Sequence, residues 1–118
     1  MNKLNPMLYS FKDKAVKNIN IQVDHETISV LFTENQTIEF TGVKSFLFVE
    51  DEFTNGNTEI LSSIEFYKDG FAEFITYDDD FEEIYGTPNF SLDFRDQSLL
   101  IEANAIHING KKIKLIKI

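Results

Sequence analysis

The stretch that decides the fold is LLIEANAIHINGKKIKLIKI, residues 99–118. Asn109-Gly110 lies between two apolar runs, and this dipeptide favours a two-residue type I′ turn, because both of its residues accept a positive φ. Such a turn fixes the register of a hairpin. The predicted pairs are Ile108–Lys111, Ile106–Ile113, Asn104–Leu115 and Glu102–Lys117 on one face, and His107–Lys112, Ala105–Lys114, Ala103–Ile116 and Ile101–Ile118 on the other.

The apolar side of this hairpin changes halfway along it, because the pairs Ile106–Ile113 and Ile101–Ile118 fall on opposite faces. A flat sheet cannot bury both faces at once. We therefore predict a bulge or sharp bend near Ala103 to Ala105, where a strand passes from one sheet to another. A register slipped by one residue is the alternative, and the turn chemistry disfavours it.

The last strand of the hairpin, Lys111 to Ile118, has lysine at four of its eight positions, which is typical of an exposed edge strand. We expect its inward aliphatic residues to be buried. These are Ile113, Leu115, Ile116 and Ile118.

Apolar residues recur with a period of two along most of the chain, which predicts further strands. We predict a first hairpin over 17–32, a long strand over 38–49 kinked at Gly42, a second hairpin over 60–77 that turns at Asp69-Gly70, a charged connection over 78–83, and a strand over 90–94 that leads through Asp96-Gln97 into the closing hairpin. Leu4, Met7, Leu8 and Phe11 lie at spacings that allow a short N-terminal helix, and an irregular segment is the other interpretation.

About eight strands joined by short turns leave no room for the helices that parallel crossovers need. The sequence therefore predicts an all-β protein, an antiparallel two-sheet sandwich or flattened barrel, formed by residues 1–118 as a single domain. There is no cysteine, no signal-like segment and no apolar run of the roughly 20 residues that cross a bilayer. We expect a cytoplasmic protein that does not bind membranes.

Charge is distributed unevenly along the chain. The formal net charge is −9, yet residues 50–83 hold twelve acidic residues and only Lys68 as a base, for a net −11, so the remainder sums to +2. Aromatic side chains on sheets can stack nucleic-acid bases, but such proteins need Lys and Arg around those aromatics. Because the aromatics here lie in or beside the acidic half, we expect no nucleic-acid partner.

Catalytic signatures are missing from the sequence. No nucleophile elbow, phosphate-binding glycine loop or paired-histidine zinc motif occurs, and neither His25 nor His107 has a second histidine at metal-ligand spacing. The run Asp78-Asp79-Asp80-Phe81-Glu82-Glu83 offers carboxylates for Ca²⁺, but it lacks the alternation of ligand and spacer and the glycine of a dedicated calcium loop. We predict a protein that is not an enzyme and uses no cofactor or metal.

An acidic, aromatic-bearing surface attracts a basic partner and speeds its association. We therefore predict a binding module for a basic protein, with an acidic face made of Glu50, Asp51, Glu52, Asp78, Asp79, Asp80, Glu82 and Glu83. The alternative is a domain that binds a small ligand, or binds or hydrolyses carbohydrate, with acids and Tyr67, Tyr77 or Tyr85 lining a cleft. A third class, a self-associating protein, would show an apolar patch on an edge strand.

Val43 to Asp51, followed by acidic loop residues, and Glu83-Ile84-Tyr85-Gly86 together resemble the pattern of small all-β proteins of Gram-positive bacteria, some of which resemble immunity-type proteins. The resemblance covers about the central third of the chain. It implies an intracellular protein that neutralises a toxin by binding it.

Overall fold

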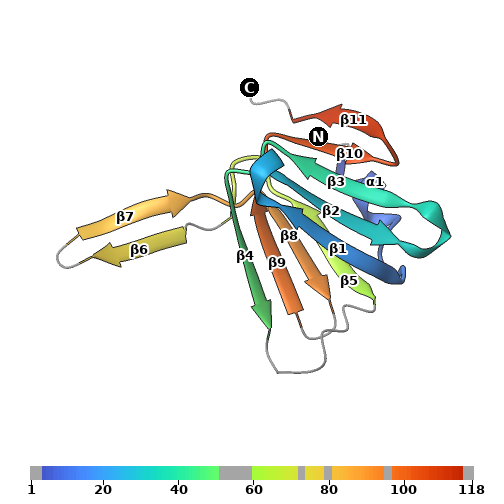
Figure 1. Cartoon of the computed structure of the whole chain (residues 1–118), viewed down its shortest axis with the longest axis horizontal. Coiled ribbons are helices and arrows are strands. Elements are labelled where there is room, and N and C mark those ends of the chain that lie inside the picture. Colours follow the sequence, from blue (N-terminus) through green and yellow to red (C-terminus); the bar gives the residue numbers. More distant parts are fainter. Residues whose placement is uncertain (1–3, 51–59, 72–73, 79–80, 95–96, 116–118) are drawn as a thin grey trace.

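A computed structural model describes residues 4–50, 60–71, 74–78, 81–94 and 97–115. Two antiparallel sheets face each other and form a sandwich (Figure 1). The predicted all-β sandwich is therefore confirmed, and the sheets do not close into a barrel. Within the described ranges, no helix has the length and apolar character needed to cross a membrane.

The first sheet has five strands in the order β1-β2-β3-β10-β11. Their bounds are β1 Val16–Gln22, β2 Thr27–Phe32, β3 Thr37–Thr41, β10 Ala105–Ile108 and β11 Lys111–Lys114. The single turns η1 (Val23–His25) and η2 (Thr33–Asn35) join β1 to β2 and β2 to β3. The predicted first hairpin is thus confirmed, and its buried face alternates strictly along β2.

The second sheet has four strands in the order β4-β9-β8-β5. Their bounds are β4 Ser45–Glu50, β5 Leu61–Phe66, β8 Phe90–Phe94 and β9 Gln97–Glu102. Every second residue of β8 and β9 is buried, so one face of each strand packs into the core between the sheets. Phe40 of β3 meets Phe90 of β8 across that core, with ring centroids 4.8 Å apart.

The chain passes between the two sheets at two neighbouring corners. One corner separates β9 from β10 at Ala103 and Asn104, which confirms the predicted bend. The other separates β3 from β4 at Gly42, so the prediction of one long kinked strand is wrong. Gly42 adopts a φ of +61°, which takes the chain out of the first sheet, and the Asn104 N–H donates to the Gly42 carbonyl at 3.2 Å.

The closing hairpin has the predicted register from its turn to the corner. Ala105, Ile106, His107 and Ile108 pair with Lys114, Ile113, Lys112 and Lys111. Asn109 and Gly110 have φ values of +51° and +82°, as a type I′ turn requires. The pairs predicted beyond Ala105 do not form in the described residues, because β10 begins there and β9 belongs to the other sheet.

β11 is an edge strand, as predicted. Ile113 and Leu115 are only partly buried against the core, rather than fully buried, because β11 is the outermost strand of the sheet. Ile116 and Ile118 lie outside the described residues.

The second predicted hairpin is wrong. Gly70 does form a turn, with a φ of +80° and its N–H donating to the Tyr67 carbonyl at 3.0 Å. However, β5 pairs with β8, while β6 (Phe74–Asp78) pairs with β7 (Phe81–Gly86). β8 is the better partner for β5 because its buried residues Phe90, Leu92 and Phe94 continue the core face of Leu61 and Ile64. The described residues of the predicted charged connection over 78–83 therefore belong to the two strands of a separate hairpin.

A short helix, α1 (Leu4–Tyr9), lies beside β5, so the helical interpretation of the N-terminus is correct. Leu4, Leu8 and Phe11 are buried in the core, whereas Met7 is exposed. Asn5 fixes the helix to β5, because its Oδ1 accepts the Phe66 N–H at 2.8 Å and its Nδ2 donates to the Phe66 carbonyl at 3.1 Å.

Candidate functional site

The predicted acidic residues fall on two separate parts of the molecule. Glu50 is the last residue of β4, opposite Gln97. Asp78 ends β6 opposite Phe81, and β7 carries Glu82 and Glu83. Asp51, Glu52, Asp79 and Asp80 lie outside the described residues.

The hairpin β6–β7 extends away from the sandwich (Figure 1). It leaves the sandwich near the beginning of β4, whereas Glu50 lies at the far end of that strand. The described part of the molecule therefore does not bring Glu50 next to Asp78. Of the predicted acidic residues that the structure describes, Asp78, Glu82 and Glu83 belong to the hairpin β6–β7, and Glu50 belongs to β4.

β6 and β7 form a two-stranded sheet that no third described strand joins. An isolated two-stranded hairpin is marginally stable in water, so it gains from a surface that covers it. The sequence of these strands, FITYD and FEEIYG, combines acidic residues with large apolar and aromatic ones. This composition is what a protein-binding surface needs, with apolar residues for contact and charges for orientation.

A hydrogen-bonded cluster holds the base of the hairpin against the sandwich. The Glu102 carboxylate accepts the Thr87 N–H at 3.2 Å and the Ser45 hydroxyl at 3.0 Å. Gly86 lies so close to Ser45 that an added Cβ would be 2.8 Å from the Ser45 Cβ. The hairpin therefore leaves the sandwich at a defined place, beside the start of β4.

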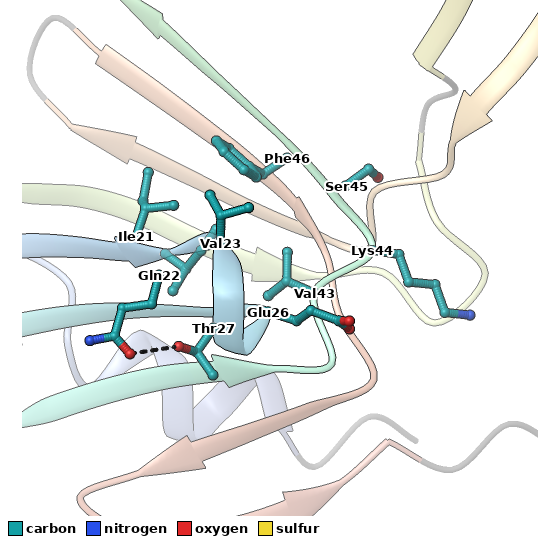
Figure 2. Close-up of a pocket in the computed structure, with 10 residues that line it drawn as sticks. Ile21, Gln22, Val23, Glu26, Thr27, Val43, Lys44, Ser45 and Phe46 are labelled. Carbon is teal, nitrogen blue, oxygen red and sulfur yellow. Dashed lines mark hydrogen bonds between the residues drawn. The ribbon is translucent and has the colours of Figure 1, made fainter.

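A groove opens between the edges of the two sheets, where β1 and η1 face the beginning of β4 (Figure 2). Its volume is about 660 Å³. The side chains of Ile21, Val23, Val43 and Phe46 line it, and Glu26 and Lys44 lie at one end (Figure 2). Gln22, Thr27 and Ser45 also line the groove, so its lining combines apolar and polar side chains.

The groove was not predicted from the sequence, and it is not the predicted acid and tyrosine cleft. Among the described residues that line it there is no tyrosine, and Glu26 is the only acidic one. Tyr67 lies elsewhere, exposed and 4.7 Å from the ring centroid of Phe71. The available signal was the run Val43 to Val49, which is apolar at both odd and even positions and so cannot be buried on one face alone.

The two histidines lie far from each other in the fold. His25 ends η1 and is exposed, and His107 lies in β10 opposite Lys112, as predicted. In the part of the chain that the structure describes, no three His, Asp or Glu residues gather as a metal site would require. The acidic run 78–83, which the sequence disfavours as a calcium loop, falls partly outside those residues.

A comparison with protein-family profiles gives one finding. The profile described as YxiG-like protein matches residues 4–113, which include both sheets, the hairpin β6–β7 and the groove. No curated protein and no solved structure matches the chain.

Proposed function

The chain belongs to the YxiG-like protein family, and we propose that it is a non-enzymatic binding protein whose hairpin β6–β7 engages a basic partner protein. The observation that carries the proposal is the projecting hairpin itself, which pairs with no third strand among the described residues. A partner that covers it would supply the contacts that a two-stranded sheet lacks.

The charge of the chain supports a basic partner. Residues 50–83 have a net charge of −11, and the acid-rich run 78–83 includes the last residue of β6 and the first residues of β7. A charged element that extends from the protein body meets a partner early in the encounter, where long-range attraction raises the association rate.

The partner class follows from the resemblance to immunity-type proteins. An intracellular inhibitor of this kind neutralises a toxin by occupying the surface that the toxin needs. A toxin that acts on nucleic acid must present Lys and Arg to phosphate, and an acidic hairpin is complementary to such a surface. Binding of this kind needs no catalytic residue and no metal in the inhibitor.

Affinity capture from a native lysate tests the proposal. The triple variant Asp78→Asn, Asp79→Asn, Asp80→Asn removes three charges from the hairpin run. The matched control, Asp24→Asn, Glu26→Gln, Glu34→Gln, removes three charges from exposed positions around the turns of the first sheet. We expect the native chain and the control to capture the same basic protein, and the hairpin variant to lose it. Equal capture by all three proteins would contradict the proposal.

The groove gives a specific reason for a second candidate function, the binding of a small apolar molecule. Its volume of about 660 Å³ lies in the range of ligand sites, and apolar side chains such as Ile21, Val43 and Phe46 line it together with polar ones. Val23→Asp would place a charge in this lining. Binding of an apolar fluorescent probe that Val23→Asp abolishes would support this function, and a native protein that does not bind the probe would exclude it.

A further inference from the structure

The two sheets of the sandwich have four edge strands, which differ in how they are protected against pairing with a strand of another molecule. β11 carries lysines at three of its four positions. The outer edge of β5 is hydrogen-bonded by the N-terminal segment, through Asn5 to Phe66 and through the Asp13 N–H to the Leu61 carbonyl at 2.7 Å. β1 is polar, with lysine, asparagine and glutamine at four of its seven positions. Each of these devices discourages pairing with another chain.

β4 has no such protection, although it is the outermost strand of the second sheet. Its sequence is SFLFVE, and Phe46, Leu47 and Val49 are 39%, 45% and 39% exposed. Leu47 and Val49 pair with the half-buried positions of β9, Leu100 and Ser98, and so lie on the outer face of the sheet. Phe46 faces the groove. Across the groove, Val23 is 73% exposed, the highest value among the large hydrophobic side chains of the described residues. An apolar edge strand of this kind is a template for a further strand.

We propose that β4 pairs with β4 of a second copy of this chain, so that the two four-stranded sheets become one continuous antiparallel sheet around a two-fold axis. Opposed residues in such a sheet must lie on the same face. The register centred on Leu47 meets this condition and places Phe46 opposite Phe48 of the partner subunit. It also places Lys44 opposite Glu50 of the partner subunit, so that opposite charges meet at both ends of the pair.

The strand sequence is therefore complementary to itself in one register. The second copy would also cover the mouth of the groove, where Phe46 and Val23 are exposed. The interface is a short strand pair with a modest apolar surface, so it belongs to the small, weak class of interfaces, and we expect a dissociation constant in the micromolar range.

Cysteine cross-linking tests the proposal and its register, because the chain has no cysteine of its own. In the proposed dimer, Leu47 lies opposite Leu47 of the partner subunit, within the Cα separation that a disulfide can bridge. Leu47→Cys should therefore form a covalent dimer under mild oxidation. Val49→Cys is the matched control on the same face, because its two copies would lie four residues out of register, about 13 Å along the strands.

Sedimentation velocity of the native protein gives the second readout. We expect a concentration-dependent shift from the monomer mass of 13.7 kDa towards twice that value. Leu47→Lys should abolish the shift, and Met7→Lys, at a site that is 41% exposed on α1, should leave it unchanged. A native protein that stays monomeric at all concentrations would overturn the proposal, and so would cross-linking of Val49→Cys in place of Leu47→Cys.

The response to salt distinguishes dimerisation through β4 from the proposed binding of a basic partner through the hairpin β6–β7. Each copy carries a net charge of −9, so added salt weakens the repulsion between copies and should strengthen the dimer. Binding of a basic partner by the acidic hairpin should weaken under the same change. The two claims can therefore fail independently.

Discussion

Asn89 holds the corner between β9 and β10, and removing its side chain should destabilise the whole fold. The residue is 9% exposed and immediately precedes β8. Its Nδ2 donates to the Ala103 carbonyl at 3.0 Å, and its Oδ1 accepts the Ala103 N–H at 3.1 Å. One side chain thus satisfies both backbone groups of a buried residue at the point where the chain leaves the second sheet.

Asn89→Ala would leave the Ala103 N–H and carbonyl without these partners. An unsatisfied buried polar group costs about 1 to 3 kcal/mol, so we expect the free energy of unfolding to fall by about 2 to 4 kcal/mol. For a domain of this size, each kcal/mol corresponds to about 3 to 5 °C in the melting temperature. The melting temperature should therefore fall by about 6 to 20 °C.

Urea unfolding followed by circular dichroism measures this change. Asn104→Ala is the matched control, because Asn104 lies at the same corner and is exposed, and its loss should change stability by less than about 0.5 kcal/mol. Asn89→Asp keeps the acceptor but loses the donor, so it should also destabilise the protein. If Asn89→Ala unfolds within 0.5 kcal/mol of the control, the corner does not depend on this side chain and our reasoning is wrong.

Three further predictions concern the helix, the corner glycine and pH. Leu8 is fully buried, so Leu8→Ala should cost about 2 to 5 kcal/mol in urea unfolding, whereas the exposed Met7→Ala should be nearly neutral. Gly42 and Gly110 both have a positive φ, but of the two only Gly42 has a neighbour within reach of an added Cβ, which would lie 2.8 Å from the Asn104 Nδ2. Gly42→Ala should therefore lower the free energy of unfolding by about 1 to 2 kcal/mol more than Gly110→Ala. A hydrogen bond to Glu65 at 2.7 Å, together with desolvation, raises the pKa of Tyr9 above 10.0. The stabilising contribution of Tyr9 is therefore present below pH 10 and is lost as the pH rises through its folded-state pKa. Tyr9→Phe should remove this part of the alkaline destabilisation, as measured by melting at a series of pH values.

The sequence predicted best those features that depend on neighbouring residues. Asn109-Gly110 fixed the closing register because the turn type allows only one. The change of apolar side at Ala103 predicted a real corner, since a strand cannot bury both faces in one sheet. The N-terminal helix was visible as a stripe of which Leu4, Leu8 and Phe11 are buried.

Features that depend on long-range pairing could not be predicted in the same way. Asp69-Gly70 forms a turn, but a turn signal does not say whether the two flanking strands pair with each other. Gly42 was recognised as a break, yet a kink and a passage between sheets produce the same local pattern. The groove is formed by residues 21–28 and 43–46, and no local pattern reveals that these two segments face each other.

The acidic residues could be identified from the sequence, but their positions in the fold could not, because a count of charges does not say which residues lie near one another. The structure assigns the described residues of the 78–83 run to a projecting hairpin and Glu50 to the end of a sheet strand. This separation narrows the proposed binding surface from a broad acidic face to one element. It also makes the proposal testable by substitutions that leave the sandwich untouched.

The most direct test of the central claim is the association rate constant of the captured partner, measured at low and high salt for the native chain and the hairpin variant. Raising the salt from about 0.05 to 0.5 M shortens the Debye length about threefold. We predict that this slows association of the native chain markedly, and that the variant with Asp78, Asp79 and Asp80 neutralised associates slowly at low salt with a weaker salt dependence. An association rate of the native chain that is unchanged across this range would contradict binding through the acidic hairpin.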